Sequence, residues 1–150
     1  MRQRNMTVLL CLLAAALLLT ACGSKSDREM DSYDAWVDKL GYTPNTPASL
    51  PGKDFNETYA IEDGGVAKAT YSSPDQVIIY RTVHEEDREL IAFEGLAEVG
   101  KSTCKGFDIP LYGTEEGAQA AQWSEGGKTF AVYFNTPVTE ELFDEFIMYI

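Results

Sequence analysis

The chain has 150 residues and a formal net charge of −12, because 24 acidic residues outnumber 12 basic ones. This acidic balance argues against nucleic acid as a partner, since phosphate contacts need clustered Lys and Arg. Eight Tyr, seven Phe and two Trp supply enough bulky apolar material for the core of one domain, so the composition also excludes a wholly disordered chain.

The first 22 residues have the three parts of a bacterial export signal. Two arginines precede an apolar run at 6–19, and small residues follow it. The run is too short for a comfortable membrane span. The residues Leu-Thr-Ala-Cys at 19–22 resemble the lipobox of bacterial lipoproteins. This resemblance implies transfer of a diacylglyceryl group to the Cys22 thiol and cleavage just before it.

Lipidation of Cys22 predicts a protein anchored on the extracytoplasmic face of the cell membrane, because two acyl chains together hold a protein stably. Removal of 1–21, which carries two Arg and no acid, leaves 129 residues and changes the formal charge from −12 to −14. We predict a flexible tether at 22–30 and a single domain at 31–150. The alternative is a plain export signal or an uncleaved anchor, in which Cys22 is incidental.

Cysteine usage predicts a domain without disulfides. Cys11 leaves with the signal and Cys22 receives lipid, so Cys104 has no intramolecular partner. An exported domain of this kind suits a Gram-positive cell surface. We interpret Cys104 as a small side chain at a strand end. The alternative is a reactive thiol whose pKa is lowered by Lys101 and Lys105.

Two segments have the apolar spacing of amphipathic helices. The first is 31–40, where Asp31 or Ser32 can cap the start and Gly41 can end the helix. The second is 139–150, where Thr139 can cap and two glutamates follow. The apolar residues that define the two stripes are Tyr33, Trp36, Val37 and Leu40, then Leu142, Phe143, Phe146, Ile147 and Ile150.

Between these helices the apolar period changes to two, which is typical of strands. In 129–135 the even residues Phe130, Val132 and Phe134 are predicted to face the core. The segment 84–93 has no clear period, and both a helical turn and a bent strand fit it. We predict an α+β fold: a twisted, mainly antiparallel sheet of six to seven strands, with an N-terminal and a C-terminal helix packed on it. The predicted strands are 55–61, 66–71, 76–83, 96–103, 107–111, 118–123 and 129–135.

The second half of the chain is similar to small lipoproteins and membrane-tethered extracytoplasmic domains, mostly from Gram-positive bacteria and of unassigned function. The similar segments are FDIPLYG at 107–113, AAQW at 120–123 and GGKTFAV at 126–132. The resemblance implies a strand, an alanine and tryptophan strand, a glycine-turned aromatic strand and a short terminal helix. Some relatives are fused to anti-sigma or sporulation proteins.

Residues that carry enzyme chemistry are scarce. His84 is the single histidine, and the chain has no Gly-x-Ser-x-Gly elbow for a nucleophilic serine. The acids beside His84 alternate in direction, and no second cluster has zinc-ligand spacing. We therefore predict no catalytic residues, no metal and no cofactor. Paired carboxylates stay open as an alternative, because 24 acids offer many pairs.

The sequence favours a cell-surface binding or sensing module without catalytic activity, directed to protein or cell-wall material. Tyr112 and Trp123 are the candidate contact residues. A tryptophan in such a strand is more often part of the core, which is the other interpretation of Trp123. The alternative function is a cell-envelope hydrolase that uses paired carboxylates. The membrane contact is made through the N-terminal lipid.

Overall fold

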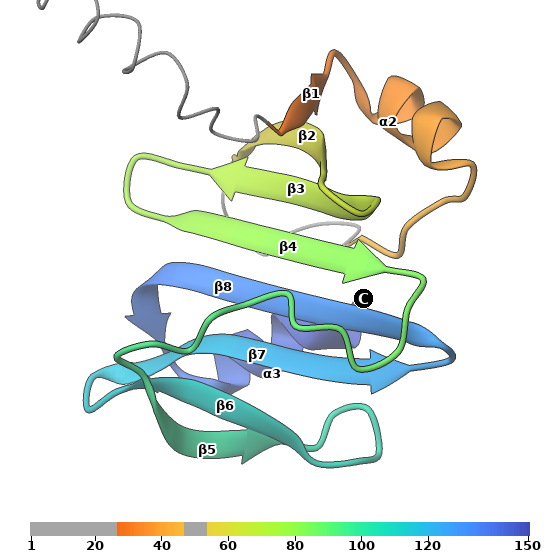
Figure 1. The fold of residues 1–150 in the computed structure, drawn as a ribbon. Coiled ribbons are helices and arrows are strands. Elements are labelled where there is room, and N and C mark those ends of the chain that lie inside the picture. Colours follow the sequence, from red (N-terminus) through yellow and green to blue (C-terminus); the bar gives the residue numbers. More distant parts are fainter. Residues whose placement is uncertain (1–26, 47–53) are drawn as a thin grey trace, which may run out of the picture.

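The computed structural model describes residues 27–46 and 54–150, which form one eight-stranded antiparallel sheet and two helices (Figure 1). The predicted α+β class is confirmed, but the predicted count of six to seven strands is wrong. The strand order is β1-β2-β3-β4-β8-β7-β6-β5. The elements are β1 (Arg28–Met30), α2 (Tyr33–Leu40), β2 (Asn56–Glu62), β3 (Val66–Ser72), β4 (Val77–Val83), β5 (Ala97–Ser102), β6 (Ile109–Thr114), β7 (Gly117–Glu125), β8 (Lys128–Val138) and α3 (Glu140–Met148).

The additional strand is β1, which lies inside the predicted tether. Its three residues pair antiparallel with β2, and Met30 packs against the main core. The structure thus places 28–30, the last part of the predicted tether, in the sheet. Three residues are too few to show a period of two, so only the partner strand about 30 residues downstream identifies this one.

Two runs of consecutive antiparallel strands make up the sheet, β1–β2–β3–β4 and β5–β6–β7–β8, and they meet where β4 pairs with β8. The chain passes from central β4 to edge strand β5 through residues 84–96, which cross over β8 and β7 on one face of the sheet (Figure 1). This crossover contains neither a helix nor a strand. Neither of the two conformations that fit the sequence is formed there.

The crossover is held to the sheet by side chains of the face that it covers. The Gln122 side-chain oxygen accepts a hydrogen bond from the Leu90 amide at 2.8 Å, and its side-chain nitrogen donates to the Arg88 carbonyl at 3.1 Å. Ile91 packs on β7 and β8 over two alanines, Ala120 and Ala131. Polar side chains thus satisfy backbone groups that no sheet partner satisfies.

Both helices begin at the predicted caps. The Ser32 hydroxyl accepts a hydrogen bond from the Ala35 amide at 3.2 Å, and the Thr139 hydroxyl accepts one from the Leu142 amide at 3.3 Å. Gly41 ends α2 in the left-handed conformation, with φ of 75°. The first helix was predicted to start at residue 31, but α2 starts two residues later, at Tyr33, because its cap Ser32 lies outside the helix. The second was predicted to end at residue 150, but α3 ends two residues earlier, at Met148.

The helices also differ from the prediction in placement. α2 packs against β1 and β2 near one edge of the sheet, whereas α3 packs against β5 and β7 toward the other edge (Figure 1). Eight residues of helix are only about 12 Å long, so α2 is too short to cross an eight-stranded sheet. Each helix therefore covers one part of the same sheet face.

The main core lies between this face and the helices. The predicted alternation in β8 is confirmed, since Phe130, Val132 and Phe134 all point into it. Trp36 enters from α2, while Phe143, Phe146 and Ile147 enter from α3. Two small residues of β3, Ala67 and Ala69, leave room for the large side chains above them.

Buried tyrosines in this core predict a loss of stability in alkali. Burial raises the pKa of both Tyr71 and Tyr80. Burial lowers the pKa of the Lys68 amine, but its hydrogen bonds to Asp27 and Glu62 outweigh burial and the net shift is upward. A pKa that is higher in the folded state stabilises the protein fully below the unfolded-state value, about 10 for both residue types. That contribution is lost as the pH rises through the folded-state pKa.

We therefore expect the free energy of unfolding to be level between about pH 7 and 9 and to fall above about pH 10. Guanidinium titrations at a series of pH values measure it, and ionisation of the buried tyrosines, followed by tyrosinate absorbance, should coincide with unfolding. The Tyr80→Phe variant should show a shallower fall, because it has one group fewer to ionise. Tyrosinate formation by all tyrosines in the folded protein would contradict the prediction.

Candidate functional site

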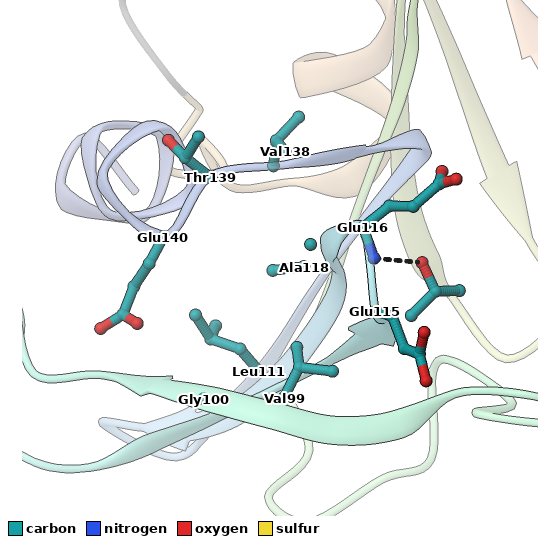
Figure 2. Close-up of a pocket in the computed structure, with 11 residues that line it drawn as sticks. Val99, Gly100, Leu111, Glu115, Glu116, Ala118, Val138, Thr139 and Glu140 are labelled. Atoms are coloured by element: carbon teal, nitrogen blue, oxygen red, sulfur yellow. Dashed lines mark hydrogen bonds between the residues drawn. The ribbon is translucent and has the colours of Figure 1, made fainter.

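A concave site of about 380 Å³ opens between β5 and the start of α3 (Figure 2). We call it the acidic hollow. Four strands, the β6–β7 turn and the first turn of α3 contribute to it. Its lining residues are Val99, Gly100, Leu111, Thr114, Glu115, Glu116, Gly117, Ala118, Val138, Thr139 and Glu140.

The floor of the acidic hollow is aliphatic. Leu111, Ala118 and Val138 are buried there, and Val99, which is 43% exposed, forms one wall. Figure 2 shows the side chains of Leu111 and Val99 rising from the sheet toward Val138. No aromatic residue is among the described residues that line the hollow. The floor therefore suits a slender aliphatic group better than a flat ring.

Three carboxylates surround this floor. Glu140 reaches down from the start of α3, while Glu115 and Glu116 lie on the other side with their carboxylates turned outward (Figure 2). All three are exposed to solvent. Within 27–46 and 54–150, no salt bridge involves them and no basic residue lines the hollow. The N-terminus of α3 contributes roughly half a positive charge, so the three acids dominate and the hollow is negative.

A close approach of two backbone segments shapes the hollow. A Cβ atom on Gly117 would lie 2.6 Å from the Val138 carbonyl oxygen, and one on Gly113 would lie 2.0 Å from the Gly117 carbonyl oxygen. Gly117 also has a φ of +143°, which residues with a side chain rarely adopt. Glycine at both positions lets the β6–β7 turn fold against the end of β8. This contact forms one end of the floor.

The structure separates the two residues that the sequence singled out as contacts. Trp123 is 6% exposed and stacks on Phe130 in the main core, with ring centroids 5.4 Å apart. Tyr112 is half-buried on the opposite sheet face, where it stacks on Phe93 of the crossover at 4.2 Å. Neither lines the acidic hollow. Trp123 thus offers no surface to a ligand, in line with its interpretation as a core residue.

Cys22 lies outside the described residues, and Cys104 is half-buried. The Cys104 sulfur accepts a hydrogen bond from the Ser102 hydroxyl at 3.2 Å. Of the two lysines that suggested a reactive thiol, Lys101 contacts Asp108 at 2.6 Å and Lys105 contacts Glu125 at 3.8 Å. Each lysine is thus engaged with a carboxylate, which favours a structural role for Cys104.

His84 lies at the surface, and its ring contacts that of Tyr42, with centroids 4.0 Å apart. Among the described residues, no group of three or more His, Cys, Asp or Glu is placed to hold a metal ion. Nor does that part of the chain contain a helix with the length and apolar character needed to cross a membrane.

Sequence reasoning missed the acidic hollow because its residues come from separate stretches between 99 and 140. The local signal was the glycine-bounded turn at 113–117, which holds two adjacent glutamates. Only the fold places Glu140 and Val99 beside this turn.

Comparison of the chain with family models, with curated proteins and with solved structures yields no match. The resemblance of the second half to small lipoproteins therefore stays a prediction. The function proposed below rests on the sequence and on the geometry of the acidic hollow.

Proposed function

We propose that this protein is a cell-surface lipoprotein, anchored by lipid on Cys22, whose domain is a non-catalytic binding module with the acidic hollow as its ligand site. The single observation behind the binding role is the combination of an aliphatic floor with three carboxylates that form no salt bridge among the described residues. The anchor is supported by Leu-Thr-Ala-Cys directly after the apolar run.

Exposure of the three carboxylates favours binding over hydrolysis. A glycosidase needs one carboxylic acid that stays protonated, usually because an apolar environment raises its pKa, and a second carboxylate that is ionised. Glu115, Glu116 and Glu140 all lie in contact with solvent. The described residues that line the hollow also include no aromatic ring on which a sugar would stack. These features support a site that attracts positive charge.

The lipid anchor would orient the domain. β1 starts at Arg28, six residues after Cys22, and six residues span at most about 22 Å. The β1 edge therefore stays close to the membrane. β5 forms the opposite edge of the sheet, seven strand spacings or about 33 Å away. The acidic hollow, which β5 borders, would thus be displayed toward partners that approach from outside.

We expect the Cys22→Ser variant to leave the membrane fraction while its domain stays folded, because it cannot receive the acyl chains. Cell fractionation and mass spectrometry of the native N-terminus measure this. Cys104→Ser is the matched control and should stay membrane-bound. Membrane retention of Cys22→Ser, or a native protein that keeps its first 21 residues without lipid, would contradict the anchor.

The binding role is tested against the hydrolase alternative with purified peptidoglycan. We expect the full chain to release no soluble fragments. Release of fragments that the Glu140→Gln variant abolishes would replace the binding role with a hydrolase.

A further inference from the structure

We propose that the acidic hollow binds a lysine side chain presented by a peptide or protein segment, with its aliphatic stem on the floor and its ammonium group at Glu140. This inference rests on the proposed function and specifies its ligand. Glu115 and Glu116 act from the other rim and increase the attraction at longer range.

The size of the hollow fits one long side chain with the adjacent backbone. Its volume of about 380 Å³ lies at the lower end of the range for ligand pockets, about 300–1,000 Å³. Leu111, Ala118 and Val138 offer an apolar surface to four methylene groups. Lysine commonly buries such a stem while its charged end stays near water. The solvent-exposed carboxylate of Glu140 lies where that end would emerge.

The negative charge of the hollow favours a positively charged ligand. Among 27–46 and 54–150, no Lys or Arg lines the hollow and none pairs with its three glutamates. An anion would benefit from the N-terminus of α3, but roughly half a positive charge there is outweighed by three negative ones. The net charge of −12 on the whole chain adds attraction for cations at long range.

The shape of the hollow favours lysine over arginine. A guanidinium group gains most from bidentate carboxylate contacts and from stacking on aromatic rings. The hollow has aliphatic walls, and its carboxylates project from separate sides. A compact ammonium group on a flexible stem needs neither a fork of acceptors nor a ring.

The surroundings of the hollow favour a peptide as the molecule that carries the lysine side chain. β5 borders the hollow and forms the edge of the sheet, so the backbone groups on its outer side have no strand partner among the described residues. Val99 and Glu98 of this strand are exposed. An extended peptide can donate and accept hydrogen bonds at such an edge. Its backbone would therefore add contacts that a free amine lacks.

The test is a nuclear magnetic resonance titration of the full chain in detergent. The probe is Nα-acetyl-lysine amide, which should shift the backbone amides of the hollow residues with a Kd of about 1 mM. Nα-acetyl-norleucine amide has the same stem without the charge and should bind about tenfold more weakly. Raising the ionic strength from about 0.01 M to about 1 M should weaken the lysine probe, because charges are then screened beyond about 3 Å.

Two neighbouring glutamates provide a matched pair of variants. Glu140→Gln should weaken the lysine probe about fivefold, whereas Glu141→Gln should leave its Kd within about twofold. Both changes remove one exposed charge from the first turn of α3, but only Glu140 lines the hollow. Equal effects of the two variants would overturn the assignment of the ammonium group to Glu140.

Further probes separate the remaining explanations. A Gly-Gly-Lys-Gly-Gly peptide should bind several-fold more tightly than pentylammonium, and equal affinity would overturn a peptide source. Norleucine and lysine probes that bind equally would overturn the cationic ligand while the hollow remains a binding site. If no probe shifts the amides of the hollow, both the inference and the binding role fail. Membrane release of Cys22→Ser tests the anchor independently of these results.

Discussion

Replacing Trp36 with alanine is expected to lower the free energy of unfolding by about 4 kcal/mol. Trp36 is fully buried, and its ring contacts that of Tyr59 with centroids 5.0 Å apart. Its ring N–H donates a hydrogen bond to the Ala60 carbonyl oxygen at 2.8 Å. An isolated helix of eight residues is not stable in water, so α2 depends on this side chain. Guanidinium denaturation measures the change.

Two variants separate the contributions of Trp36. Trp36→Phe retains most of the ring packing but removes the hydrogen bond, and we expect a loss of about 1–2 kcal/mol. Asp38 lies on the exposed side of the same helix, so the Asp38→Ala variant should change the free energy of unfolding by less than about 0.5 kcal/mol. If the alanine variants at positions 36 and 38 were equally stable, α2 would not be anchored by Trp36.

Replacing Gly117 with alanine is expected to cost about 3 kcal/mol and to distort the acidic hollow. The new methyl group would lie 2.6 Å from the Val138 carbonyl oxygen, and the φ of +143° would be strained. The turn at 114–117 and the end of β8 would have to move apart. Denaturation measures the stability, and amide shifts of Val99 and Leu111 report the change in the hollow.

Gly126→Ala is the matched control for this variant. Gly126 has a φ of +62°, but a Cβ atom there would meet nothing within 4 Å. The control therefore carries the backbone strain without the clash and should cost about 1 kcal/mol. Amide shifts in the hollow should not change in this control. If the two variants lost equal stability, the close approach between Gly117 and Val138 would not be a significant constraint.

Interactions between neighbouring residues allowed several features of the fold to be predicted from the sequence. Ser32 and Thr139 cap the helices as predicted, because a hydroxyl satisfies a free amide only three residues away. Gly41 ends α2, since it adopts a left-handed conformation at little cost. The alternation of Phe130, Val132 and Phe134 identified the core face of β8. Each of these signals acts over a few residues.

The lengths and the number of helices and strands were harder to predict from the sequence, because they depend on distant partners. β1 is a strand only through its pairing with β2. The segment 84–96 is neither helix nor strand, because side chains such as Gln122 hold its backbone against β7. Because the segment 84–96 covers this face of the sheet, Thr129 and Ala131 on the outer face of β8 are also buried. The alternation of residues in β8 would by itself predict that this outer face is exposed to solvent.

The sequence by itself determined the acidic charge, the α+β class, the caps of both helices and the core face of β8. It also supplies the residues at 19–22 on which the proposed anchor depends. Only the tertiary structure decided that Trp123 is buried, that Tyr112 lies on the other face, and that Val99, the 113–117 turn and Glu140 form one hollow. The physical reason is that caps and alternation arise from neighbouring residues, whereas a concave site arises from contacts between segments that the chain itself keeps apart.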